Sequence, residues 1–423
     1  MSGPFGSTLK GDAYLSSGDI AFIRVQNIKG GFDINDNDLV YISNKDNEKI
    51  KSSSLQEGDL ILSKVGNSIG YFAKVSSDLG KCNISENNIG IKLSSYSDIE
   101  KSFILTYLNA KYANKLVLRR KSGNAQPKIN VDDLCRIPIL IFPKLSENIH
   151  NLIQLHEAYL NQSILSYKQA EDILNKELGI TNIENTKNYS VKSFSESFGE
   201  SNRLDAEYYQ DKYDSIKELL DTKENVESLC HIYDNNYIPT NKQKYQYIEL
   251  SNIGVNGEIS GVEFFNGKEL PTRARRLVKK NQVIISSVEG SLQSCALITE
   301  EYNGALCSNG FFIIDSDCIS SETLLILFKS VPIQSLLKQR CSGTILTAIS
   351  NDELKKIPLP FIKLIVQKEI TQKVQESFKL RKDSKNLINV AIRAVEIAIE
   401  KNEEYASQWL IENTNEIYHK DKY

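Results

Sequence analysis

"KSGNAQPKINVDDLCRIPI", residues 121–139, decides the fold because a related stretch, "CSGTILTAISNDELKKIPL", recurs at residues 341–359. At a constant offset of 220 residues, seven of the 19 positions are identical, namely Ser122/Ser342, Gly123/Gly343, Ile129/Ile349, Asp132/Asp352, Leu134/Leu354, Ile137/Ile357 and Pro138/Pro358. A single matching dipeptide would mean little, but this many identities in one ungapped window indicate an internal repeat.

The rest of the two halves matches in the same order. Three further pairs of segments align: "FIRVQNI" (22–28) with "YIELSNI" (247–253), "GDLILSKVGNSIG" (58–70) with "NQVIISSVEGSLQ" (281–293), and "ISENNIGIKL" (84–93) with "LCSNGFFIID" (306–315). The first two pairs are each typical of a short apolar strand that runs into a turn. The chain is therefore predicted to be a tandem duplication.

The composition is that of an ordinary globular protein. With 423 residues and 40% hydrophobic side chains, the chain is expected to form two or three domains. No apolar run approaches the ~20 residues of a membrane span, and the opening "MSGPFGSTLK" lacks the regions of a signal peptide. We therefore predict a cytoplasmic protein with no membrane partner. The net charge of −3 gives no global electrostatic argument for a polyanionic partner.

Catalytic and metal-binding motifs are missing from the sequence. Its seven cysteines form no C-x-x-C pair and its four histidines do not cluster with them, so neither disulfides nor a metal site are expected. No P-loop, G-x-G-x-x-G, H-E-x-x-H, G-x-S-x-G or Asn-Pro-Pro-aromatic stretch occurs. Cys230 and His231 are interpreted as a half-buried thiol beside a surface imidazole rather than a catalytic pair, and "EGDLILSK" (57–64) as an ordinary strand rather than a nuclease site. No catalytic residue is predicted.

Two long amphipathic helices are predicted, one after each repeat. Residues 145–180 carry an apolar stripe at three- and four-residue steps or their sums: Ile149, Ile153, Leu160, Ile164, Tyr167, Leu174 and Leu178. A second stripe follows residue 363: Val366, Ile370, Val374, Phe378, Ile388, Ala391, Val395 and Ala398. The simplest partner for each stripe is the other helix, packed antiparallel as a rigid spacer. His156 falls within the first stripe and is interpreted as a packed histidine.

The order of the repeated segments carries a family resemblance over essentially the whole chain. "IPLPFIKLIVQKEI" (357–370) closes one repeat and opens a helix, "RLDAEYY" (203–209) enters the second repeat, and "SGPFGSTLKGDAY" (2–14) opens the first. Together with the duplication, these stretches resemble the specificity subunit of type I restriction-modification systems. Two departures are present: the second proline is displaced in residues 137–152, and the first repeat has no complete counterpart of residues 209–234.

The resemblance implies an α+β protein with two pseudo-two-fold-related target recognition domains separated by two long antiparallel helices. The implied segments are a first recognition domain at 1–144, short at its N-terminus, a spacer helix at 145–180, a linker at 181–203, a second recognition domain at 204–362, and a second spacer helix with C-terminal tail at 363–413. Each domain would contact one half of a split DNA sequence. The chain itself would have no catalytic centre, metal or cofactor.

The resemblance also implies partners. These are double-stranded DNA, modification subunits that bring S-adenosylmethionine and methylate adenine, and motor-nuclease (restriction) subunits that cut unmodified DNA. The spacer helices would dock the modification subunits.

Candidate DNA contacts follow from the residue types that bind phosphates and base edges. Basic residues cluster in "KLVLRRKSGNAQPK" (115–128) and again in "RARRLVKK" (273–280). The predicted phosphate contacts are Arg119, Arg120, Lys121 and Lys128 in the first repeat and Arg273, Arg275, Arg276, Lys338 and Arg340 in the second. The predicted base contacts are Lys64, Asn67, Asn87, Asn88 and Gln126 in the first repeat and Glu289, Gln293, Asn309 and Thr344 in the second.

Three alternatives stay open at the level of sequence. One is the specificity subunit of another restriction enzyme or of a phage-defence methyltransferase. Another is a scaffold whose duplicated domains bind proteins, which predicts no salt-dependent affinity for DNA. The third is a stand-alone nuclease, which requires metal-dependent cleavage by the purified chain.

Overall fold

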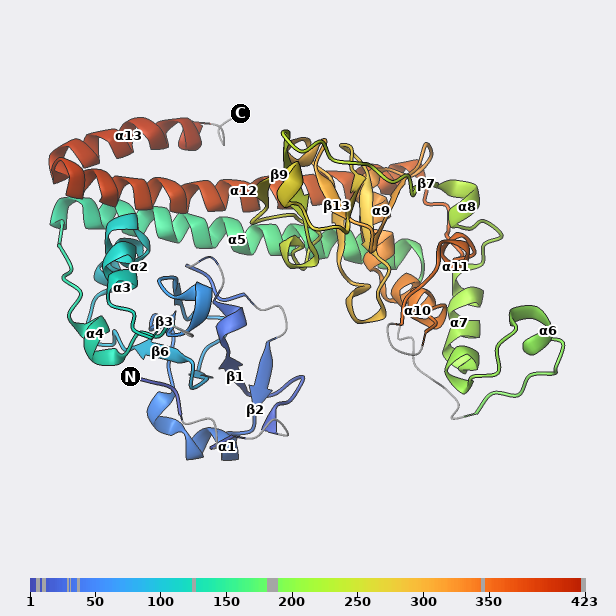
Figure 1. Ribbon diagram of the computed structural model, residues 1–423, viewed down its shortest axis with the longest axis horizontal. Helices are drawn as coiled ribbons and strands as arrows, with labels where there is room; N and C mark the ends of the chain where they lie inside the picture. Colours follow the sequence, from blue (N-terminus) through green and yellow to red (C-terminus); the bar gives the residue numbers. More distant parts are fainter. Residues whose placement is uncertain are drawn as a thin grey trace. The chain divides into compact units, whose positions relative to one another are not determined.

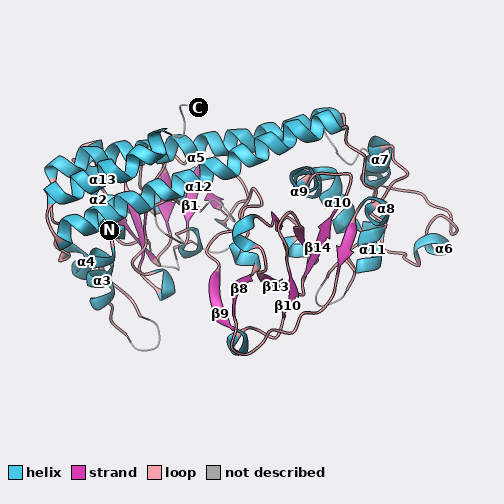
Figure 2. Ribbon diagram, turned by 90° about the horizontal axis from the view of Figure 1, so that it is seen from above, coloured by secondary structure: helices cyan, strands magenta, loops and turns pink. Residues whose placement is uncertain are grey.

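The computed structural model describes residues 1–4, 8–9, 13–28, 30, 32–35, 39–123, 127–180, 189–343 and 347–419, apart from the side chains of residues 67, 200 and 415–419 (Figure 1). The chain divides into two compact units: unit 1 comprises Met1–Asn161 with Arg381–Tyr423, and unit 2 comprises Gln162–Leu380. Each unit combines small β-sheets with helices (Figure 2). The predicted fold class, a mixed α and β structure in two halves with long helices, is confirmed.

Unit 1 contains two three-stranded sheets. Their orders are β2-β1-β5 and β4-β3-β6, with β1 Ile20–Ile23, β2 Val40–Ile42, β3 Leu60–Ser63, β4 Phe72–Lys74, β5 Cys82–Ile84 and β6 Asn88–Ile91. β1 pairs antiparallel with β2 and parallel with β5, whereas β3 is antiparallel to both neighbours. All four residues of β1 and of β3 are buried, which explains why these strands are nearly continuous apolar runs instead of alternating.

Unit 2 repeats both sheets and adds one strand to each. Their orders are β9-β8-β13-β10 and β12-β11-β14-β7, with β7 His231–Tyr233, β8 Lys244–Ile248, β9 Glu263–Asn266, β10 Ala274–Leu277, β11 Val283–Ser286, β12 Cys295–Leu297, β13 Leu306–Ser308 and β14 Phe311–Asp315. β8 again has one antiparallel and one parallel neighbour. The added strands are β10 and β7. The edge that β7 covers along β14 is covered in unit 1 by Ser2, which forms an antiparallel bridge with Ile89 of β6.

The strand ladders fix the alignment of the two repeats. Leu60 pairs with Ile91 in unit 1, and the equivalent pair in unit 2 is Val283 with Ile314, so both strands share an offset of 223 residues. The sequence-based alignment of "ISENNIGIKL" with "LCSNGFFIID" used an offset of 222 and is wrong by one residue. Short apolar strands hold too few identities to set their own register, whereas a one-residue slip in the sheet would reverse the face of every side chain.

Short helices accompany the sheets in both units. Unit 1 has α1 Asn44–Lys49, α2 Asp98–Asn109, α3 Lys111–Arg119 and α4 Val131–Cys135, and unit 2 has α6 Phe198–Ser201, α7 Asp211–Leu220, α8 Val226–Leu229, α9 Ser321–Lys329, α10 Val331–Gln339 and α11 Asn351–Lys355. The equivalent helices α2 and α9 are capped by Ser97 and Ser320, and the equivalent helices α4 and α11 are capped by Asn130 and Ser350. In all four helices the side chain of the N-cap residue accepts a hydrogen bond from a backbone N–H of the first turn. The similarity of the two units therefore extends to the hydrogen bonds that start these helices.

Each repeat ends in a long helix. α5 spans Pro143–Glu177 and α12 spans Leu364–Glu400. The chain then turns, and α13, Glu403–His419, folds back along α12 within unit 1 (Figure 1). Asn402 Oδ1 accepts a hydrogen bond from the N–H of Tyr405 at 2.8 Å, and this cap starts the new helix. The sequence pattern does not show the turn, because one asparagine within an amphipathic pattern is a weak stop signal.

The two predicted stripes supply the cores of both units. In unit 1, Ile149 of α5 and Val395 of α12 belong to one buried cluster. In unit 2, Leu174 of α5 and Val374 of α12 belong to another. The stripe prediction is wrong at Ile164, whose side chain is 48% exposed. The cause is that the buried positions on this part of α5 are occupied by polar side chains.

These buried polar side chains pair across the two long helices within each unit. In unit 1, His156 is buried and its Nδ1 lies 2.6 Å from Ser384 Oγ. In unit 2, Ser163 Oγ lies 3.1 Å from Ser377 Oγ, and both serines are fully buried. The interpretation of His156 as a packed histidine is confirmed.

An ion cluster ties α3 to the C-terminal end of α12 in unit 1. Lys111 Nζ lies 2.6 Å from Glu400 Oε1, and the Tyr112 hydroxyl donates to the same oxygen at 2.9 Å. Arg393 Nη1 donates to it at 3.1 Å. The hydrogen bonds from Lys111, Arg393 and Tyr112, in that order, lower the pKa of Glu400 to about 2.

Candidate nucleic-acid interface

Three predicted DNA-contact residues of unit 1 come together where β3 ends. The N–H of Lys64 donates to Asn87 O at 2.9 Å, and the segment that carries Lys128 bridges the residue after Lys64. We call Lys64, Asn87 and Lys128 corner 1. The Lys64 ammonium donates to Ser2 Oγ at 2.9 Å. Burial lowers the pKa of Lys64, the nearby Glu86 raises it and Lys128 lowers it, so the two lysines are close enough to interact.

Unit 2 has the same backbone arrangement with different side chains. The N–H of Ser287 donates to Gly310 O at 2.9 Å, and Ala348 bridges the residue after Ser287. We call Ser287, Gly310 and Ala348 corner 2. The predicted base contact Glu289 lies beside it, with its N–H donating to Thr347 O at 3.0 Å. One framework therefore carries two lysines and an asparagine in unit 1 but small uncharged residues in unit 2.

Two of the predicted phosphate contacts are engaged inside the protein. Arg340 Nη1 lies 2.7 Å from Glu353 Oε2, and the Arg340 side chain is only 12% exposed. At the equivalent position, Arg120 Nη1 lies 4.0 Å from Asp133 Oδ1. Burial alone would raise the pKa of Glu353, but hydrogen bonds from Lys356 and Arg340 lower it overall. The recurrence of this pair indicates that Arg120 and Arg340 hold α4 and α11 in place.

The three arginines of "RARRLVKK" differ in what they contact. Arg275 and Arg276 donate to backbone carbonyls at 2.7 Å and 3.0 Å. Arg273 Nη2 lies 3.3 Å from Glu249 Oε1, and its side chain is 62% exposed. Arg273 is thus the member of this cluster that is best placed to contact an external anion.

The exposure of the remaining predicted DNA-contact residues decides which of them can contact DNA. Five are exposed: Arg119, Lys121, Gln293, Asn309 and Lys338. Asn88, in contrast, is fully buried and its Nδ2 donates to Ile23 O at 2.9 Å, so it cannot reach a base edge and we remove it from the candidates. Gln126 and Thr344, as well as the side chain of Asn67, lie outside the described residues.

A pocket of about 300 Å³ beside corner 1 contains residues that the sequence analysis missed. Tyr14 and Phe22 line it as a stacked pair with ring centroids 5.4 Å apart. Arg24 and Gln26 line it together with Asn87 of corner 1. The sequence signal for this pocket is the repeated segment "FIRVQNI", in which the polar residues Arg24 and Gln26 alternate with apolar ones.

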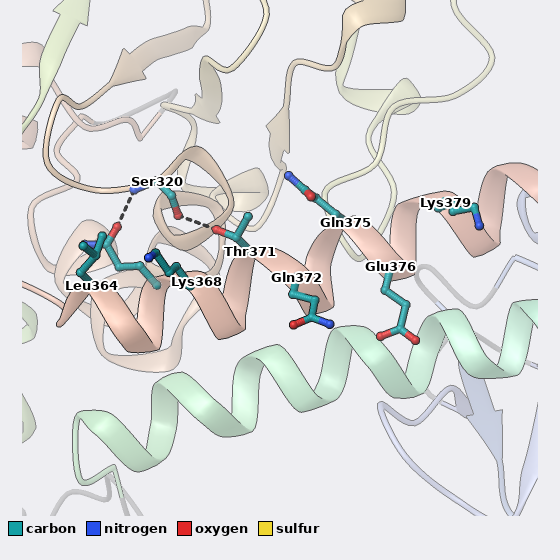
Figure 3. Close-up of a pocket in the computed structure, with 9 residues that line it drawn as sticks. Ser320, Leu364, Lys368, Thr371, Gln372, Gln375, Glu376 and Lys379 are labelled. Atoms are coloured by element: carbon teal, nitrogen blue, oxygen red, sulfur yellow. Dashed lines mark hydrogen bonds between the residues drawn. The ribbon is translucent and has the colours of Figure 1, made fainter. Parts of the chain in front are cut away.

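A larger pocket in unit 2, of about 450 Å³, lies against the start of α12 (Figure 3). Its polar side chains fix α9 to α12: the N–H of Ser320 donates to Gln367 Oε1 at 2.8 Å, and Ser320 Oγ lies 2.9 Å from Thr371 Oγ1. Gln375 Nε2 donates to Glu322 Oε1 at 2.7 Å. These contacts give the pocket a structural role in positioning α9.

Asp59 of "EGDLILSK" and Cys230 both have structural roles. The Asp59 carboxylate accepts hydrogen bonds from the N–H groups of Gln56 at 3.0 Å and Leu93 at 2.9 Å, so it closes turns at the start of β3. His231 is exposed as predicted, whereas Cys230 is buried rather than half-buried, and this burial raises the pKa of its thiol to about 12. Across the described ranges, no group of His, Cys, Asp or Glu is placed to hold a metal ion.

Within the part of the chain that the structure describes, every helix is too short or too polar to cross a bilayer.

Comparison with known proteins identifies similar structures but no similar sequence. No family model and no curated protein matches the chain. Solved structures that resemble this chain include two whose descriptions name the type I restriction-modification system. One is the "Type-I restriction-modification system S subunit from M. genitalium", with 13% identity, a TM-score of 0.38, and coverage of 93% of this chain and 92% of that chain.

Two further structures give lower scores. The HsdS subunit from Thermoanaerobacter tengcongensis has 12% identity and a TM-score of 0.28, with 90% of each chain covered. A chain from a structure on "complex assembly" of "the type I R-M system" has 12% identity and a TM-score of 0.29, with 91% of each chain covered. Because all three TM-scores are below 0.5, we base the proposed function on this chain's own residues.

Proposed function

We propose that this chain is the DNA-specificity subunit of a type I restriction-modification complex, with each unit contacting one half of a split DNA site. The observation that carries the proposal is the pair of corners. Equivalent backbone hydrogen bonds build the same framework in both units, and the framework presents different side chains in each. Two domains that bind different half-sites need this combination of a shared fold and diverged tips.

The exposed cations support the same proposal. Phosphate contacts supply affinity without sequence information, whereas contacts to base edges supply specificity. In unit 1, Arg119, Lys121 and Lys128 are exposed around corner 1, and in unit 2 Arg273 and Lys338 are exposed. These residues would position the duplex, while polar side chains at the corners contact bases.

The chemistry of the complex is assigned to other subunits. Modification subunits would bring S-adenosylmethionine and methylate adenine, and restriction subunits would cut unmodified DNA. α5 and α12 would set the gap between the half-sites and dock the modification subunits. The occupied carboxylate of Asp59 argues against a nuclease site in "EGDLILSK".

The test is a methylome comparison. A host that carries this gene and a neighbouring adenine methyltransferase gene is compared with the same host lacking only this chain. A split adenine-methylated motif that disappears with the chain supports the proposal. Unchanged methylation with both proteins expressed would overturn it and favour a protein-binding scaffold.

A further inference from the structure

Arg24 and Glu249 occupy the same position in the two repeats. Arg24 follows β1 and Glu249 follows the equivalent strand β8, and each residue caps a short 3-10 helix, Val25–Asn27 in unit 1 and Leu250–Asn252 in unit 2. The N–H of Arg24 donates to the side-chain oxygen of Asn27 at 2.9 Å, and the N–H of Glu249 donates to that of Asn252 at 2.8 Å. The local backbone is thus the same, but the side chains have opposite charge.

In unit 1 this position opens into the pocket beside corner 1. Arg24 and Gln26 line it, and Asn87 belongs to both the pocket and the corner. The stacked rings of Tyr14 and Phe22 form an apolar side of the same pocket. The pocket combines a guanidinium, two amides, the Glu86 carboxylate and an aromatic surface beside two lysines, and this mixture of donors and acceptors suits the edge of a nucleobase better than a protein side chain.

In unit 2 the equivalent position is also accessible. The Glu249 side chain is 39% exposed and its Oε1 accepts from Arg273. The N–H of Asn309 donates to Arg273 O at 2.8 Å, which brings a second exposed polar residue to the same place. At an offset of 223 residues, Asn309 is the counterpart of Glu86, which lines the pocket in unit 1. Charge therefore differs at two equivalent positions of the two sites.

We propose that Arg24 and Glu249 are specificity-determining residues, each contacting one base pair in the half-site of its own unit. Arg24 presents paired donors, which match the N7 and O6 acceptors of guanine in the major groove. Glu249 presents acceptors, which match the N4 amino group of cytosine. The inference rests on the proposed function and adds the residue and the base class to it.

The experiment is a binding selection with the full-length chain and a library of random duplex DNA. The wild type should recover a bipartite motif. Arg24→Gln should relax one guanine-containing position in one half and weaken binding to the wild-type motif roughly 5- to 150-fold, as expected for one bidentate base contact. Glu249→Gln should relax one cytosine-containing position in the other half only.

Two further variants keep the test decisive. Lys45→Gln changes an exposed residue on α1 and should leave both halves unchanged. Arg24→Lys keeps the charge but loses the planar pair of donors, so it should relax the same position even if Arg24→Gln lowers the thermal midpoint.

The selection distinguishes a failure of the specificity assignment from a failure of the proposed function. If the wild type recovers a bipartite motif but the Arg24 and Glu249 variants recover the same motif, the specificity assignment is overturned and the proposed function stands. If the wild type recovers no bipartite motif, the proposed function fails and this inference fails with it.

Discussion

The salt dependence of DNA binding offers a quantitative test of corner 1 and the cations around it. Lys121 and Lys128 are both exposed, and Lys128 forms a β-bridge with Ser122, the residue that follows Lys121. If both contact phosphates, the double variant Lys121→Ala/Lys128→Ala loses two counterion-releasing contacts, each of which contributes ~0.9 to the slope of log K against log salt. The slope should become less negative by ~1.8. Between about 50 and 200 mM salt, the wild type should then lose ~12-fold more affinity than the variant.

Fluorescence anisotropy with a labelled duplex measures this slope over a salt titration. The matched control is Arg120→Ala, which removes a neighbouring cation whose guanidinium lies by Asp133. The control should lower the free energy of unfolding and leave the slope nearly unchanged. An unchanged slope in the double variant would refute the assignment of Lys121 and Lys128 as phosphate contacts.

The fold makes three further predictions. Ile149→Ala should lower the free energy of unfolding in urea by ~2–5 kcal/mol because this side chain is fully buried, whereas Ile164→Ala should change it by less than ~0.5 kcal/mol because Ile164 is exposed; equal effects would contradict the assigned helix faces. Because the pKa of Glu400 is lowered to about 2, its contribution to stability should be complete above the ordinary value of 4.5 and disappear as the pH falls from there toward 2. The thermal midpoints of wild type and Glu400→Gln should therefore converge over this range, and a constant difference would count against the cluster. Iodoacetamide should label Cys135 and Cys318 rapidly in the native protein and leave the five buried thiols unlabelled until unfolding, as mass spectrometry of the labelled peptides would show.

The similarity of the two units could be predicted because residues with strict backbone roles stand at equivalent positions in both. Gly123 and Gly343 both have positive φ, 94° and 130°, which glycine adopts at low cost. Ser122 and Ser342 each form a bridge at the same place in the turn. Identities at such positions can be found in a sequence without any knowledge of the fold.

Other features depend on contacts that a linear pattern does not contain. The exposure of Ile164 follows from the packing of Ser163 against Ser377, which are distant in sequence. Asn88 resembles any polar loop residue, yet it is buried because its amide satisfies Ile23 O. Arg24 lies between two apolar residues typical of a strand, so its sequence position does not mark it as a binding residue. Its place in a pocket with Tyr14 and Asn87 depends on the three-dimensional fold.

The corners have a consequence for how this protein can evolve. The hydrogen bonds that the two corners share run from backbone N–H to backbone C=O, so they do not depend on which side chains stand there. Residues 64, 87 and 128 can therefore be exchanged without disturbing the surrounding core, and the same holds for residues 287, 310 and 348. Selection can then alter the contacts of one unit while the other unit stays as it was. The side chains at the corner of each unit can therefore change independently of those in the other unit.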